Sequence, residues 1–63
     1  MKYYIKTRYN PQLDKPYYVA LGKLKASEAK KMENSLYGHN VVEGYKKDEY
    51  LAKCEELGIE PII

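Results

Sequence analysis

Every aromatic side chain in this chain is a tyrosine, and this constrains where its largest side chains can be placed. The 63 residues include eight tyrosines and neither phenylalanine nor tryptophan. A phenol ring can pack in a core while its hydroxyl stays at the edge, or it can lie on an open surface. Tyr3, Tyr4, Tyr17 and Tyr18 lie in two lysine-rich segments that are typical of strands. We therefore expect some rings inside the fold and others on an open sheet face beside positive charge.

The length of the chain allows one small domain, residues 1–63, with a modest core. A domain of this size buries only about 60% of the surface that its unfolded chain exposes. Cys54 is the only cysteine and His39 the only histidine, which excludes an intramolecular disulfide and a structural zinc site with the usual four ligands. We expect no cofactor, and the association of two copies is one way in which such a chain gains stability.

Charge is divided unevenly along the chain. Residues 1–31 hold eight basic and two acidic side chains, whereas residues 32–63 hold three basic and seven acidic ones. The net charge is only +2, and the pI of about 8.6 is below the value above about 9 that is typical of dedicated nucleic-acid binders. Such a bipolar chain can steer an anionic partner to one side, or let two copies associate head to tail.

The first 24 residues predict a β-hairpin over Lys2–Leu24. In residues 2–9 the alternation places Tyr3, Ile5, Thr7 and Tyr9 toward the core and Lys2, Tyr4, Lys6 and Arg8 away from it. In residues 17–24 the corresponding inward set is Tyr17, Val19 and Leu21, and the outward set is Tyr18, Ala20 and Gly22. Leu24 does not fit this alternation, so we expect a bulge near Gly22.

The rest of the chain predicts two helices and two short strands. A helix is expected over about residues 27–37, a strand over 41–45, and a second helix that begins near Lys47 and stops at Gly58. Residues 59–63 can form a last strand, which Pro61 confines to an edge or to the end of the pairing. The predicted fold class is α+β: a two-layer α/β sandwich in the order β-β-α-β-α-β, with both helices on one sheet face.

The sheet face without helices is the predicted binding surface. Its candidate residues for contact with a partner are the outward side chains of the hairpin: Lys2, Tyr4, Lys6, Arg8 and Tyr18. Tyrosines beside an arginine are typical of the centres of protein interfaces. Aromatic rings beside lysines are also how sheets hold single-stranded nucleic acid. We expect a protein partner first, single-stranded nucleic acid as the alternative, and a homodimer interface as a third possibility.

No residue pattern predicts catalysis. Cys54 shares an apolar helical stripe with Tyr50, Leu51 and Leu57, which indicates a small core residue and not a nucleophile. His39 follows a glycine that ends a helix, which is typical of an exposed loop histidine. The sequence contains no phosphate loop, zinc spacing or nucleophile elbow. We expect a binding module that is not an enzyme, that lies in the cytoplasm because it has a lone thiol and no signal segment, and that does not contact a membrane.

Overall fold

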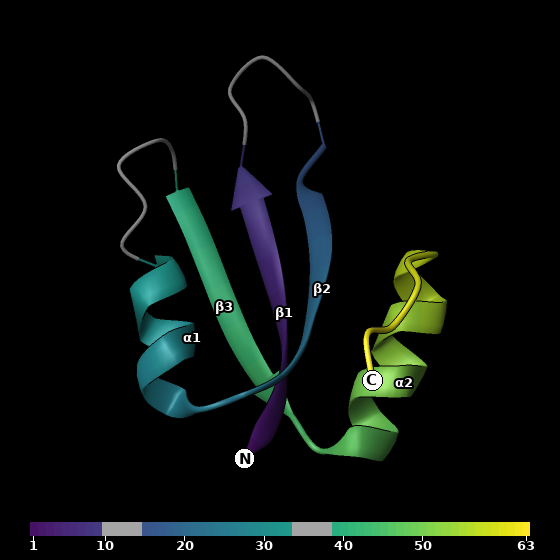
Figure 1. The fold of residues 1–63 in the computed structure, drawn as a ribbon. Helices are drawn as coiled ribbons and strands as arrows, with labels where there is room; N and C mark the ends of the chain where they lie inside the picture. The colour runs from purple at the N-terminus through teal and green to yellow at the C-terminus, as the bar shows by residue number, and fades with distance from the viewer. Residues whose placement is uncertain (10–14, 34–38) are drawn as a thin grey trace.

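Over the residues that the structure describes, the protein is a small α+β fold with three antiparallel strands and two helices (Figure 1). The computed structural model describes residues 1–9, 15–33 and 39–63. Its elements are β1 (Lys2–Tyr9), β2 (Tyr17–Leu24), α1 (Ala26–Glu33), β3 (His39–Tyr45) and α2 (Lys47–Leu57). The order of the first five predicted elements is therefore confirmed, although the turn of the hairpin and the end of the first predicted helix lie outside the described residues.

Strand β1 is the centre of the sheet, whose order is β2-β1-β3. Both neighbours pair with β1 in the antiparallel sense, so that Lys6 lies opposite Val19 on one side and opposite Val42 on the other. Since successive side chains of a strand point to opposite faces, β1 sends Tyr3 and Ile5 to one face and Tyr4 to the other. The predicted alternation of β1 is confirmed.

Strand β2 contains the predicted bulge, but its inward set differs from the prediction. Tyr4 lies opposite Gly22 and Ile5 lies opposite Ala20, so Leu21 is the extra residue. Beyond this bulge Ala20 packs in the core with Ile5, which puts Tyr18 and not Tyr17 on the same face. The segment from Tyr17 to Leu21 is apolar or aromatic at every position, so alternation alone could not choose between its two faces.

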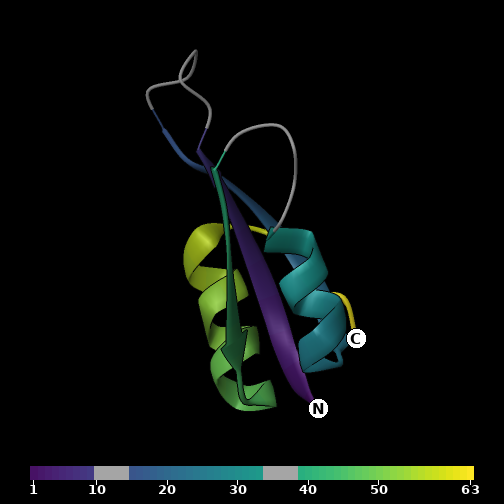
Figure 2. The same cartoon turned by 90° about the vertical axis from the view of Figure 1, so that its left-hand side faces the viewer.

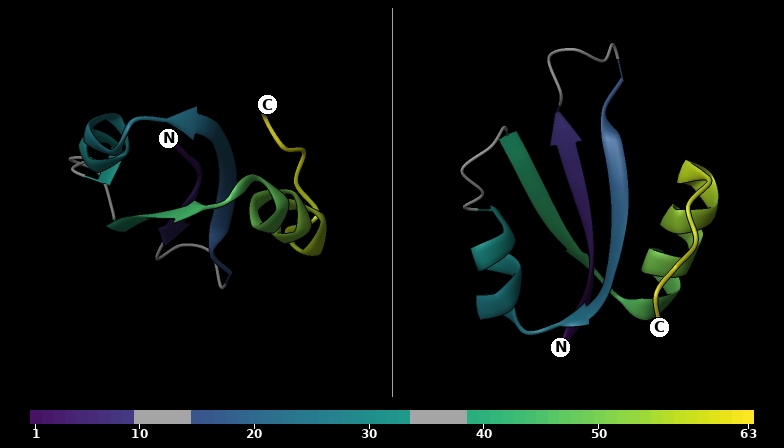
Figure 3. Two further views of the ribbon diagram at one scale, coloured as in Figure 1. Left: turned by 90° about the horizontal axis from the view of Figure 1, so that it is seen from below. Right: turned by 45° about the horizontal axis from the view of Figure 1, so that its top comes forward.

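The two helices lie on opposite faces of the sheet, and the prediction of both on one face is wrong. Seen edge-on, the sheet has α1 on one side and α2 on the other (Figures 2 and 3). Helix α1 packs against β3, and α2 packs against β1 and β3. The physical reason is the central strand: β1 carries aromatic rings on both faces, and a ring on each face gains from being covered.

The larger core lies on the α2 side of the sheet, the face that carries Tyr3, Ile5, Thr7 and Tyr9 of β1. It is formed by Ile5, Ala20, Tyr50 and Cys54, with Tyr3, Tyr45, Leu51, Leu57 and Ile59 partly buried around them. The rings of Tyr3 and Tyr50 lie 5.2 Å apart between centroids, within the range of favourable aromatic pairs. Cys54 is fully buried, which confirms its expected place in the core.

A smaller core lies on the α1 side, the face that carries Lys2, Tyr4, Lys6 and Arg8. Here Tyr4 and Ala29 are buried, with 9% and 4% of their surface exposed. The Tyr4 ring lies over Gly44 of β3: a Cβ added to Gly44 would come within 2.9 Å of Cε1 of Tyr4. Gly44 thus provides the space in which this ring lies flat on the sheet.

The last five residues do not form the predicted strand. Helix α2 ends at Gly58, whose φ is 69°, and the N–H of Ile59 donates to the carbonyl of Cys54 at 3.0 Å. The chain then passes the β2 edge, where Ile62 accepts a hydrogen bond from the Tyr50 hydroxyl at 3.0 Å and its N–H donates to the same oxygen at 2.7 Å. Because the N–H of Ile62 donates to this hydroxyl, it does not donate in a strand ladder.

Candidate interaction surface

The structure does not bring the five predicted contact residues together on one open face. Lys2, Tyr4, Lys6 and Arg8 share the α1 side, as predicted, but Tyr18 lies opposite Thr7 on the α2 side. Tyr4 is also buried, whereas the prediction required it to be exposed. The expected common surface is therefore wrong, for two physical reasons: the bulge reverses the facing of β2, and α1 covers the ring of the central strand.

The open part of the α1 side is basic and includes a tyrosine that the prediction placed inside. Tyr17 lies opposite Arg8 and is 56% exposed. Lys6 is half-buried next to it along the sheet, opposite Val19. At the other end, Lys2 and Lys25 line a hollow of about 450 Å³ beside the start of α1. Tyr17 thus takes the place that the sequence pattern assigned to Tyr18.

The α2 side contains a cleft of about 180 Å³ between the sheet and the second half of α2. We call it the tyrosine cleft; it is lined by Ile5, Thr7, Tyr9, Tyr18, Glu43, Tyr45, Lys53 and Leu57. Each of the three strands contributes one ring: Tyr9 from β1, Tyr18 from β2 and Tyr45 from β3. Tyr9 is 51% exposed, so α2 does not cover this end of the face.

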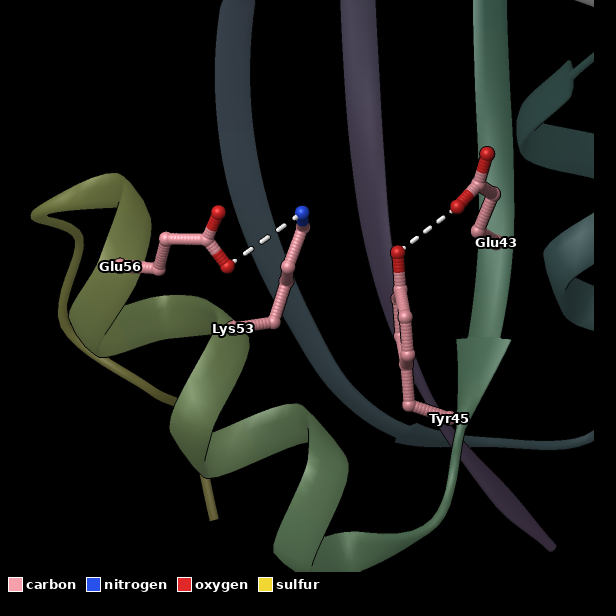
Figure 4. Close-up of polar contacts among 4 residues, drawn as sticks. All are labelled: Glu43, Tyr45, Lys53 and Glu56. Atoms are coloured by element: carbon pink, nitrogen blue, oxygen red, sulfur yellow. Dashed lines mark hydrogen bonds and ion pairs between the residues drawn. The ribbon is translucent and has the colours of Figure 1, made fainter.

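Two polar contacts define the cleft (Figure 4). The Tyr45 hydroxyl donates a hydrogen bond of 2.7 Å to the Glu43 carboxylate, and the Lys53 ammonium lies 3.5 Å from the Glu56 carboxylate. Burial, the hydrogen bond to Glu43 and the negative charges of Glu43, Glu56 and Glu49 together raise the pKa of Tyr45 to about 12. Tyr45 is therefore a neutral donor at physiological pH in negatively charged surroundings.

Sequence reasoning missed two rings of the tyrosine cleft. It predicted that Tyr9 points toward the core, and this is the correct face of the sheet. Helix α2 is too short, however, to cover the end of β1 where Tyr9 lies. Sequence reasoning gave Tyr45 no role, because the pattern of a five-residue strand does not show which neighbours flank it. Tyr45 pairs with Tyr3 because β3 lies next to β1 in the sheet, and the local sequence does not show this order.

The fold converts the bipolar sequence into two differently charged sides. Helix α1 has Lys30 and Lys31 in its last turn and lies on the side that carries the basic residues of β1. Helix α2 has Asp48 and Glu49 in its first turn, and Glu55 and Glu56 follow further along. The basic residues of β1 thus lie on the α1 side, whereas Glu43, Glu49 and Glu56 act electrostatically on Tyr45 on the α2 side.

Comparisons with known proteins add no functional information: no family model matches the chain, and neither do any curated protein sequences or solved structures.

Within residues 1–9, 15–33 and 39–63, no three histidine, cysteine, aspartate or glutamate side chains are grouped so that they could hold a metal ion. In the same part of the chain, neither helix has the length and apolar character needed to span a membrane.

Proposed function

We propose that this protein is a non-catalytic binding module that contacts a partner protein through the tyrosine cleft. The observation that carries the proposal is that Tyr9, Tyr18 and Tyr45, one from each strand, line a single cleft, and that α2 leaves the Tyr9 end of this cleft uncovered. Tyrosines supply contact area and a hydrogen-bonding hydroxyl at little cost in side-chain entropy, and they are enriched at the energetic centres of protein interfaces.

The size and charge of the cleft favour a protein partner over other ligands. At about 180 Å³ it is smaller than the roughly 300 to 1,000 Å³ of typical small-molecule pockets, and it fits one side chain of a larger partner. Glu43 lies in its wall, and Glu49 and Glu56 act electrostatically on Tyr45. These carboxylates disfavour the phosphates of a nucleic acid on this side.

The polar groups of the cleft do not favour catalysis. A general base works best with a pKa near the operating pH, whereas the pKa of Tyr45 is raised to about 12. Cys54, which is the only thiol, is fully buried in the core and cannot reach a substrate. Binding without chemistry is therefore the function that these groups support.

Two adjacent tyrosines allow a matched test of this proposal. Tyr17 and Tyr18 are neighbours in β2 and point to opposite faces, so Tyr18→Ser removes a ring from the cleft and Tyr17→Ser removes one from the α1 side. Partners captured from the native host by wild-type protein should be lost with Tyr18→Ser and kept with Tyr17→Ser, in the presence of nuclease. Equal capture by all three proteins would contradict the proposal.

A second candidate function is binding of single-stranded nucleic acid on the α1 side. It is favoured by the exposed ring of Tyr17 next to Arg8 and Lys6. In proteins that bind single strands, bases stack on such rings and basic side chains contact the phosphate backbone. This function predicts the reverse mutational pattern: Tyr17→Ser weakens the binding of a fluorescent oligonucleotide, Tyr18→Ser has no effect, and affinity falls log-linearly with salt. Absence of oligonucleotide binding at low salt would exclude it.

A further inference from the structure

The walls of the tyrosine cleft match the chemistry of a cationic side chain. Its described lining includes the rings of Tyr9, Tyr18 and Tyr45 and the apolar side chains of Ile5 and Leu57. The face of a phenol ring is the negative end of its quadrupole, so it attracts a cation placed over it. Leu57 offers an apolar contact for the methylene stem of a long basic side chain.

Carboxylates complete this match. Glu43 lies in the wall of the cleft and accepts a hydrogen bond from Tyr45, which leaves lone pairs of the carboxylate available for a second donor. Glu56 and Glu49 are near enough to act on Tyr45 electrostatically. Among the described residues that line the cleft, the cation is Lys53, and it is paired with Glu56 at 3.5 Å. The three carboxylates therefore outnumber the ammonium.

We propose that the tyrosine cleft receives an arginine side chain of the partner protein, with the guanidinium stacked on the tyrosine rings and hydrogen-bonded to Glu43. This inference rests on the proposed function and specifies its partner. Arginine suits the site better than lysine because its planar guanidinium stacks on aromatic rings and presents several donors to a carboxylate in a fixed geometry. The volume of about 180 Å³ admits one such side chain.

The experiment uses two short peptides that differ only in charge. The probes are acetyl-Gly-Arg-Gly-amide and the same peptide with citrulline, a neutral residue of almost the same shape, added to the wild-type protein and followed by amide and ring NMR shifts. The arginine peptide should shift signals of Tyr18, Glu43 and Tyr45 in a saturable way, and the citrulline peptide should not. Shifts of equal size with both peptides, shifts confined to the α1 side, or no saturable shift would overturn the inference.

Three variants test the assigned contacts. Glu43→Gln should weaken the arginine peptide roughly two- to five-fold, which is the range of an exposed ion pair, and Lys53→Met should strengthen it because a competing cation is removed. Lys6→Gln changes charge on the opposite face and should leave the affinity unchanged. A loss of affinity with Lys53→Met would show that the cleft prefers an anion, and would also overturn the inference.

The outcomes separate this inference from the proposed function. If Tyr18→Ser abolishes capture of a host protein while the arginine peptide leaves the cleft unaffected, the arginine assignment fails and the protein-binding function stands. If capture is independent of Tyr18, the proposed function fails whatever the peptides do.

A second copy of this chain could also supply the basic side chain. Light scattering tests this: a mass that increases with concentration in the wild-type protein, but not in Glu43→Gln, would contradict a foreign partner.

Discussion

At the scale of single residues, the hydroxyl of Tyr50 shows how a tyrosine is accommodated in the core. Tyr50 is completely buried, yet its hydroxyl both donates to and accepts from the backbone of Ile62. Burial raises the pKa of Tyr50, which agrees with a phenol that stays protonated within the fold. The ring therefore serves twice: it fills the core on the α2 side and fixes the last residues of the chain against β2.

We predict that Tyr50→Phe lowers the free energy of unfolding by about 1 to 2 kcal/mol, the net worth of two hydrogen bonds. The ring volume is kept, so the loss reports on the hydroxyl alone. Urea unfolding measures it, and faster hydrogen exchange at the Ile62 amide should accompany it. Tyr17→Phe is the control, because its exposed hydroxyl should contribute less than about 0.5 kcal/mol. Equal stabilities of the two variants would contradict this role of Tyr50.

Tyr45 gives a prediction about pH. Its pKa is raised from 10.0 to about 12, so the folded protein holds this proton more tightly than the unfolded chain does. The resulting stabilisation is fully present below pH 10 and is lost as the pH rises from 10 toward 12. An NMR titration of the Tyr45 ring carbon should show the raised midpoint, and Glu43→Gln should lower it by removing a negative charge. An unchanged midpoint in the variant would show that Glu43 has no influence.

At the scale of elements, two glycines have positive φ: Gly22 lies in the bulge of β2 and Gly58 ends α2. Their surroundings differ. Gly22 in the β2 bulge has a φ of 80°, and a Cβ added there would lie 2.9 Å from the carbonyl oxygen of Ile62. Gly58 at the end of α2 has a φ of 69°, and an added Cβ would have no atom within 4 Å. The first position is restricted by both conformation and space, and the second by conformation alone.

This difference predicts an order of stability. Gly58→Ala should cost about 1 kcal/mol, the strain of a left-handed conformation in a residue with a Cβ. Gly22→Ala should cost more, because the same strain adds to a backbone contact that can be relieved only by moving the last residues away from β2. Thermal unfolding of both variants measures the order, and a larger loss with Gly58→Ala would contradict the close approach of Ile62.

The elements also show what the sequence could predict. The alternation of β1 could be derived because lysine and arginine alternate with Tyr3, Ile5 and Thr7. The facing of β2 could not, because Tyr17 to Leu21 offers no polar residue on either face. The start and end of α2 were predictable from local residues, Gly58 above all, whereas the last strand failed because a tertiary contact with Tyr50 took its place.

At the scale of the whole molecule, the decisive feature is the central position of β1. Sheet order and the side on which each helix packs depend on contacts between distant segments, and periodicity carries no information about them. With β1 at the centre, burial of Tyr4 on one face and of Ile5 on the other is favourable, so one helix packs on each face of the sheet. The same division leaves the basic residues of β1 on the α1 side, and it places the tyrosine cleft on the side where Glu43, Glu49 and Glu56 act on Tyr45.

The facing of Tyr18 is the claim on which both functional proposals depend, and nuclear Overhauser effects measure it directly. We predict contacts from the Tyr18 ring to the methyl group of Thr7, which lies opposite it, and from the Tyr17 ring to the side chain of Arg8. Contacts from the Tyr18 ring to the methylene groups of Lys6 or Arg8 would place it on the α1 side. That result would remove Tyr18 from the cleft and contradict the account.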